Sequence, residues 1–254
     1  MLKRVGKKHI LIFTSVLLLI LFVCLQVVHK KQNFNLSIEE KVYSNQEEYN
    51  EIEIVYPQLQ GMKDEDKEYR INRLIENEIN KILKQNSLFD ENNLFLHLDY
   101  EVKFLNKNII SIVYKGSEGA VHNIQTRSYA ILMATTIDME NETIITLNDL
   151  INDFDALSSL LLEDKFESIT SWDGIKGGYK ISWNYEGSKR GLLLEHLLTA
   201  ADFDISNHYI EWYTDGDNLI IVDFESGYYY EYLMNFDSLQ DVVDRDFIKR
   251  TKVV

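Results

Sequence analysis

Acidic side chains are the first residues in this sequence whose types could do chemistry. Asp202, Asp204, Asp215 and Asp217 could supply a pair of catalytic carboxylates or the oxygen ligands of a calcium ion. The tetrad Asp215–Asn218, however, lacks the twelve-residue spacing and terminal glutamate of a calcium loop, and its composition is that of a hairpin turn. We therefore expect a turn here and neither a catalytic nor a metal site, although acids are so frequent in the chain that the sequence leaves glycosidase-type pairs open.

The histidines offer no recognised catalytic pattern. They are His9, His29, His97, His122, His196 and His208. None lies in an H-E-x-x-H motif or beside a G-x-S-x-G nucleophile elbow. His122 stands in an unusual setting, shortly after Gly119, and the default interpretation is a histidine satisfied beside a tight turn. The alternative interpretation is a binding role for Gly119 and His122.

The densest aromatic patch runs from Tyr228 to Tyr232, with Trp212 and Tyr213 upstream. Tyrosine and tryptophan are favoured at recognition surfaces, because they give a large contact area for a small loss of entropy. They are also ordinary strand residues, and half of an alternating strand faces the core. The candidate binding residues are Gly119, His122, Trp212, Tyr213, Tyr228, Tyr230 and Tyr232.

Charge excludes one class of partner. The 254 residues carry 41 acidic and 26 basic side chains, a formal charge of −15. Residues 1–31 hold six of the basic residues and no acid, so the rest of the chain carries −21. Such a body is repelled by nucleic acid and by anionic lipid.

Cys24 is the only cysteine, which excludes a disulfide, a thiol nucleophile and a cysteine zinc site in the rest of the chain, and we expect no cofactor.

The N-terminal residues predict a membrane anchor. Residues 10–28 are apolar except for Thr14, Ser15 and Gln26, and as a helix they would span about 28 Å, close to the hydrocarbon core of a bilayer. Basic residues precede the segment, so we expect residues 1–9 in the cytoplasm and the acidic remainder outside. The segment lacks a small-x-small cleavage pattern, which favours an uncleaved anchor over the alternative, a cleaved signal peptide.

Elements that would position these residues can be read from the apolar spacing. Residues 29–50 are polar and predict a tether. Helices are expected at 64–86, 152–166 and 189–201, and strands at 51–56, 94–105, 109–114, 120–138 and 143–147. Three further strands, at 209–213, 219–224 and 228–234, predict an antiparallel meander, and 236–243 a closing turn or helix. The glycines at 116–119 indicate a loop. Strands dominate and helices are separate insertions, so the predicted class is α+β, with a single exported domain of antiparallel sheet and a few packed helices.

Several short motifs, taken in order, resemble one family. They are Ile54–Leu59, Ile71-Asn72 with Ile75, Ile110–Tyr114, Gly119–His122, Ile137-Asp138, Ile145–Leu150, Trp212–Thr214 and Asn218–Ile221. Together they resemble the exported domain of unknown function 3298, preceded by its 4163-type N-terminal part, over residues 50 to 245. The resemblance divides the exported domain into a 4163-like part, 51–145, and a 3298-like part, 146–254. The family pattern has two glycines and an alanine before its histidine, whereas Val121 is inserted here.

The resemblance implies a binding role. This domain is found in lysozyme-sensing membrane anti-sigma factors of the RsiV type and in some peptidoglycan deacetylases. With residues 1–9 as the cytoplasmic part, we expect neither a sigma-binding domain nor an appended deacetylase domain. We therefore expect a non-enzymatic, membrane-anchored extracytoplasmic domain of a Gram-positive-type bacterium that binds or senses lysozyme-like basic proteins. The alternatives are a cell-wall glycan-binding or peptidoglycan-modifying accessory protein, and a subunit of an envelope complex with a large exposed apolar patch.

Overall fold

The computed structural model describes residues 36–46, 51–86, 94–122, 125–163, 166–169, 210–225 and 228–252. All of them lie in one compact unit, Leu36–Val254. The predicted anchor, the predicted helix at 189–201, Asp202 and Asp204 lie outside the described residues. No helix within the described part of the chain is both long enough and apolar enough to cross a membrane.

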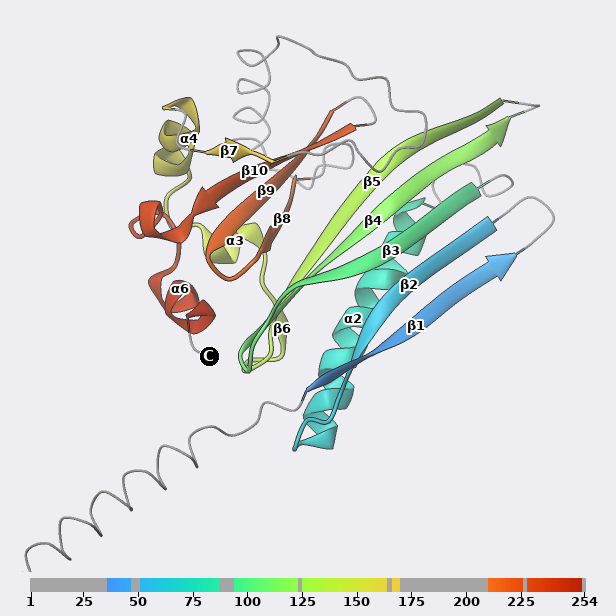
Figure 1. The fold of residues 1–254 in the computed structure, drawn as a ribbon, viewed down its shortest axis with the longest axis horizontal. Helices are drawn as coiled ribbons and strands as arrows, with labels where there is room; N and C mark the ends of the chain where they lie inside the picture. Colours follow the sequence, from blue (N-terminus) through green and yellow to red (C-terminus); the bar gives the residue numbers. More distant parts are fainter. Residues whose placement is uncertain are drawn as a thin grey trace, which may run out of the picture. The chain divides into compact units, whose positions relative to one another are not determined.

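Two sheets dominate this unit (Figure 1). The large sheet has the strand order β1-β2-β3-β4-β5-β6 and is antiparallel except for the parallel pair β2–β3. Its strands are β1 (Ser37–Gln46), β2 (Glu51–Gln60), β3 (Leu94–Leu105), β4 (Ile109–His122), β5 (Gln125–Asp138) and β6 (Thr143–Ile144). The small sheet has the order β7-β10-β9-β8 and is antiparallel throughout. Its strands are β7 (Glu167–Ser168), β8 (Ile210–Thr214), β9 (Asn218–Glu225) and β10 (Tyr228–Asn235). The predicted α+β class and the predicted meander are confirmed.

One long helix, α2 (Glu65–Asn86), covers one face of the large sheet. Its apolar side chains recur every three or four residues, and Ile71, Ile75 and Ile79 are buried against Ile54, Leu96 and Ile112 of the strands. The Asp64 carboxylate accepts a hydrogen bond from the Lys67 N–H at 2.9 Å, which satisfies one of the unpaired donors of the first turn. The predicted helix is therefore confirmed, including its start.

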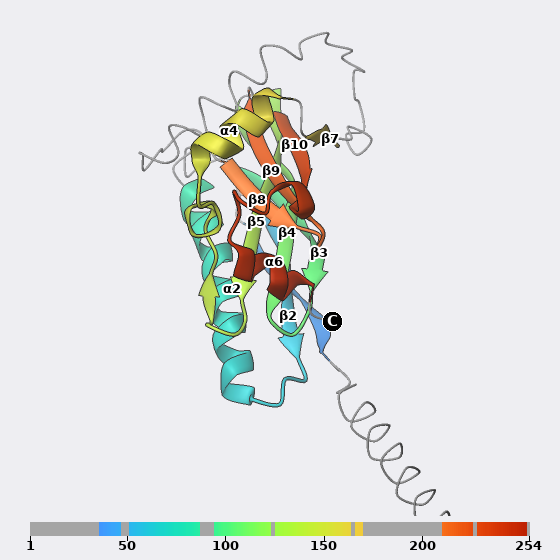
Figure 2. The same cartoon turned by 90° about the vertical axis from the view of Figure 1, so that its left-hand side faces the viewer.

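Short helices cover the outer face of the small sheet (Figure 2). They are α3 (Leu147–Leu150), α4 (Phe154–Leu162), η1 (Phe236–Ser238) and α6 (Arg245–Thr251). Asp153 caps α4, and Asp244 caps α6. Phe236 and Phe247 form an edge-to-face pair with centroids 5.9 Å apart in the core beneath them. α6 was not predicted, and residues 147–150 form a helix where a strand end was expected.

The two sheets pack face to face across β4 and β5. Val113 and Leu132 of the large sheet meet Tyr213, Ile220 and Val222 of the small sheet in a buried cluster. Because successive side chains of a strand point to opposite faces, β4 contributes Ile110, Ile112 and Tyr114 to the core under α2 and Val113 to this one. The described part of this unit thus has four layers, namely α2, the large sheet, the small sheet and the short helices.

Residues 37–46 correct the predicted tether, because they form β1. All ten pair in register with β2, from Ser37 opposite Gln60 to Gln46 opposite Glu51. Most of the strand is exposed, so its sequence lacks the apolar alternation by which strands are recognised. Pairing with β2, rather than burial of its own side chains, stabilises this strand.

β2 also continues through Pro57, where the strand was expected to stop. Its pairing with β3 ends at Ile54, so Pro57 needs no ladder hydrogen bond on that side. Beyond it, the Asn72 side chain of α2 accepts from the Leu59 N–H at 2.8 Å and donates to the Leu59 carbonyl at 2.9 Å. A helix side chain therefore replaces the missing strand.

The glycines at 116–119, expected to form a loop, lie inside β4 instead. Gly116 pairs with Leu98 in β3 and with Ile131 in β5. A Cβ atom on Gly116 would lie 1.8 Å from the carbonyl oxygen of His97. Close approach of the neighbouring strand, rather than a turn, accounts for the glycine at this position.

Replacing Gly116 by alanine is therefore expected to destabilise the domain by about 2 kcal/mol or more, because β3 and β4 must separate to admit the new methyl group. Denaturant unfolding followed by circular dichroism measures the change. Ser117→Ala, one residue along the same strand, is the control and should change the free energy of unfolding by less than about 0.5 kcal/mol. Equal stability of Gly116→Ala and wild type would contradict the assigned packing.

Candidate functional site

A buried carboxylate lies between the two sheets. Glu231 of β10 is only 5% exposed, and its Oε1 accepts a hydrogen bond from the Tyr213 hydroxyl at 2.6 Å. Lys115 of β4 reaches the same oxygen at 3.4 Å, which joins the two sheets by an ion pair. Burial, and then the hydrogen bond to Glu231, raise the pKa of Tyr213. The tyrosine therefore stays a neutral donor to the Glu231 carboxylate.

Lys103 of β3 extends this cluster toward solvent. Its ammonium group lies 5.7 Å from the centre of the Tyr213 ring and 2.5 Å from the Glu101 carboxylate. A cation over an aromatic face is attracted by the ring quadrupole, so Lys103 orients the ring whose hydroxyl binds Glu231. Glu101, with its side chain 59% exposed, marks the point where the interface opens to solvent.

A second carboxylate, Glu211 of β8, caps an edge of the large sheet. Its Oε2 accepts a hydrogen bond from the Ala134 N–H of β5 at 3.2 Å. β6 pairs with β5 only at Ile137 and Asp138, so Glu211 satisfies a backbone group that no described strand reaches. Burial raises the pKa of Glu211 to about 7, against the opposing effects of the Ala134 hydrogen bond and the charge of Lys81.

The face of the large sheet opposite α2 carries a row of acids where the small sheet does not cover it. Glu53 of β2 lies opposite His97 of β3, and Asp99 and Glu101 follow at alternate positions of the same strand. Leu96 and Leu98 alternate with these β3 residues and are buried under α2. Glu53, His97, Asp99 and Glu101 therefore face away from α2. We call Glu51, Glu53, Asp99 and Glu101 the acidic face, and all four are exposed.

Phe95 and His97 border the acidic face. Their rings are 4.5 Å apart between centroids, and the Nε2 of His97 lies 3.5 Å from the Glu51 carboxylate. Phe95 is also directly opposite Gly119 in the ladder. Gly119 thus belongs to the edge of this face, whereas only the backbone of His122 is described, at the end of β4 opposite Gln125. Their binding roles remain predictions.

Sequence reasoning passed over Phe95 and His97. The signal that would have found them is the alternation in residues 95–101, where Phe95, His97, Asp99 and Glu101 alternate with the buried Leu96 and Leu98 and the partly buried Tyr100. Such a strand has one core face and one exposed face, and the exposed one here is acidic and aromatic.

The aromatic patch expected to form a binding surface is divided between two cores. Trp212 and Tyr232 pack under the short helices, where Trp212 meets Phe247 with centroids 5.9 Å apart, and Tyr230 packs there while partly exposed. Tyr213 faces the other way, into the cluster between the sheets. Trp212, Tyr213 and Tyr232 are at most 6% exposed, which corrects the expectation that they form an exposed surface. The physical reason is that both faces of the small sheet are covered. Tyr228, of which only the backbone is described, begins β10 opposite Glu225.

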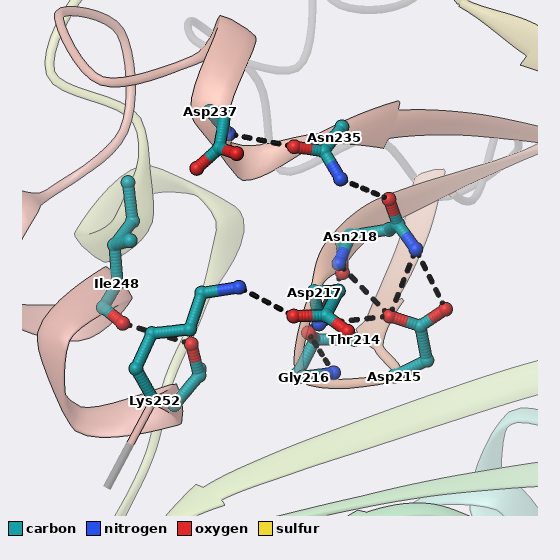
Figure 3. A network of polar contacts seen from close by, with 10 residues as sticks. Thr214, Asp215, Gly216, Asp217, Asn218, Asn235, Asp237, Ile248 and Lys252 are labelled. Atoms are coloured by element: carbon teal, nitrogen blue, oxygen red, sulfur yellow. Dashed lines mark hydrogen bonds and ion pairs between the residues drawn. The ribbon is translucent and has the colours of Figure 1, made fainter.

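The aspartates at 215 and 217 serve the β8–β9 turn, as expected (Figure 3). The Asp215 carboxylate accepts hydrogen bonds from the Asp217 and Asn218 backbone N–H groups, at 3.0 and 2.8 Å. Gly216 has a φ of 98°, which favours glycine, and a Cβ there would lie 2.4 Å from the Phe104 ring. Asp217 pairs with Lys252 after α6. Within the described residues, no three His, Cys, Asp or Glu side chains are grouped so as to hold a metal ion.

Comparisons with known proteins agree with the motif-based resemblance. The family described as deacetylase PdaC matches residues 43–118. Over these residues the match supports the predicted resemblance. The match extends from β1 into β4 and includes the whole acidic face, but it ends one residue before Gly119.

Two solved structures of the DUF3298 family are similar to this chain. The protein from Bacteroides fragilis NCTC 9343 is 10% identical with a TM-score of 0.45, and the match covers 85% of this chain and 98% of that one. The protein from Pseudomonas aeruginosa PAO1 is 10% identical with a TM-score of 0.46, covering 83% and 93%. No curated protein matches the chain.

The raised pKa of Glu211 predicts how stability varies with pH. The folded state binds this proton more tightly than the unfolded state, in which the pKa is near 4.5. The resulting stabilisation is complete below pH 4.5 and is lost as the pH rises through about 7. Glu211→Gln keeps the acceptor for Ala134 without the partly buried charge, so it should be more stable than wild type at pH 8, by about 2 kcal/mol.

Denaturant unfolding at pH 5 and pH 8 measures this difference. Glu163→Gln, which changes an exposed glutamate after α4, is the matched control and should follow the wild type at both pH values. If Glu211→Gln shows the same loss of stability between pH 5 and pH 8 as the wild type, Glu211 is not the titrating group.

Proposed function

We propose that this protein is a membrane-anchored, extracytoplasmic binding or sensing domain without enzymatic activity, whose partner is a strongly basic protein of the lysozyme kind. The acidic face is the observation that carries the proposal. Its four exposed carboxylates lie on two neighbouring strands of the large sheet. Lysozyme as the partner, and the anchor at residues 10–28, come from the sequence and its family resemblance.

Electrostatics supports a cationic partner. Two lysines beside the acidic face are already engaged, because Lys103 pairs with Glu101, and Lys115, opposite Asp99, pairs with the buried Glu231. Glu53 and Asp99 have no such ion pair among the described residues. A surface of one sign steers an oppositely charged protein and raises its rate of association, and salt weakens this effect.

A wall-glycan accessory protein is the second candidate. The observation that favours it is the match to a family described as a deacetylase, over the same strands that carry the acidic face. Phe95 beside His97 offers an aromatic surface at the border of that face. A neutral glycan would bind there with little dependence on salt, which separates the two candidates.

A titration of the full chain in detergent with lysozyme, at low and at high salt, tests the proposal. The wild type should bind with a Kd in the micromolar range or tighter at low salt and more weakly at high salt. The double variant Glu53→Lys with Asp99→Lys should weaken binding at low salt by about tenfold or more, because it reverses two charges on the acidic face. Glu140→Lys with Glu163→Lys makes the same change in net charge at exposed positions outside the face and should weaken binding less than about threefold.

Three outcomes would contradict parts of this proposal. Equal losses in the two double variants would mean that net charge alone attracts lysozyme, without a defined face. No binding at low salt would exclude lysozyme as the partner. Salt-independent binding of peptidoglycan fragments that is lost in Phe95→Ala would instead establish the wall-glycan function.

A further inference from the structure

Exposed apolar side chains gather on a single strand at the edge of the large sheet. Among the described residues, four large hydrophobic side chains are exposed, and three of them, Ile38, Val42 and Tyr43, belong to β1. Val42 is 55% exposed. β1 pairs with β2 on one side, and no described strand pairs with its other side. An unpaired edge strand presents N–H and C=O groups that another strand can bind.

We propose that the edge of β1 pairs with β1 of a second copy of this chain, in an antiparallel arrangement around a two-fold axis. A closed dimer needs a surface that is complementary to itself. In an antiparallel pair the two-fold axis stands perpendicular to the sheet, so each residue lies opposite one whose number has the same parity. This condition leaves few registers, and the charges of β1 distinguish them.

Two registers would pair nine of the ten residues of β1. One places Lys41 opposite the partner's Lys41, and like charges directly opposite each other destabilise a sheet. The other places Val42 opposite the partner's Val42, which covers the most exposed apolar side chain of the strand. It also places Lys41 opposite the partner's Tyr43, a cation beside an aromatic ring.

The remaining pairs of the register centred on Val42 are also compatible. Glu40 lies opposite the partner's Ser44 and Glu39 opposite the partner's Asn45, so no like charges meet. Edge charges normally prevent strand pairing. On β1, however, Lys41 already pairs with Glu39 on the same strand, with Nζ and Oε1 2.9 Å apart, so this part of the edge is locally neutral.

A dimer of this kind has a consequence for binding, which rests on the proposed function. Because the axis is perpendicular to the sheet, both acidic faces lie on the same side of a continuous twelve-stranded sheet and both α2 helices on the other. Two sites presented side by side bind a partner or a surface with several sites more tightly than one site does.

Cysteine cross-linking of the full chain in detergent, with Cys24→Ser as background, tests the register. Residues directly opposite each other in an antiparallel pair have Cα atoms about 4.5–5.5 Å apart, which suits a disulfide. Val42→Cys should give a disulfide-linked dimer under mild oxidation. Lys41→Cys and Tyr43→Cys should each give little dimer alone, and a mixture of the two should give the mixed dimer.

Tyr69→Cys is the matched control, because Tyr69 of α2 is 65% exposed and lies outside the edge. The proposal is overturned if Val42→Cys forms no more dimer than Tyr69→Cys, or if Lys41→Cys alone cross-links as well as Val42→Cys. These outcomes do not depend on lysozyme binding, so this inference and the proposed function fail independently.

Discussion

Burial of β4 on both faces is the constraint on which the rest of the structure depends. Its side chains alternate between the core under α2, which receives Ile110, Ile112 and Tyr114, and the interface with the small sheet, which receives Val113. Ser111 stands in that second row and is completely buried. A strand with two buried faces fixes the position of everything on either side, because a shift by one residue would exchange the two rows.

This double burial determines where polar groups can lie between the sheets. The Ser111 hydroxyl bonds to the Thr136 hydroxyl at 2.8 Å and accepts from the Thr214 N–H at 3.1 Å, so it ties β4 to both β5 and β8. The Glu231 carboxylate accepts a hydrogen bond from Tyr213 and pairs with Lys115. The Glu211 carboxylate accepts a hydrogen bond from the Ala134 N–H. A buried polar group without a partner is costly, so these contacts fix the relative position of the two sheets more narrowly than apolar contact alone would.

The sequence predicted well those elements whose one apolar face is read from local spacing. α2 and the β8–β10 meander are of this kind, as is the Asp215–Asn218 turn. The sequence failed to predict the segments whose conformation depends on a neighbouring strand. β1 shows no alternation because it is mostly exposed, and Gly116 resembles a loop residue until β3 is beside it. The tyrosines of β10 resemble a surface because alternation reveals two faces of a strand but not that both are covered.

The same reasoning explains why the acidic face lies where it does. The small sheet packs mainly on β4 and β5 and reaches the end of β3, where Lys103 meets Tyr213, so Glu51, Glu53 and Asp99 on the same face stay exposed. Exposure alone requires hydration, which lysine, serine or threonine would satisfy equally well. Some of the acids are compensated within the sheet, because Asp99 lies directly opposite Lys115 of β4 and Glu101 pairs with Lys103. Glu53 has no ion pair among the described residues, and under the proposed function a cationic partner would compensate its charge.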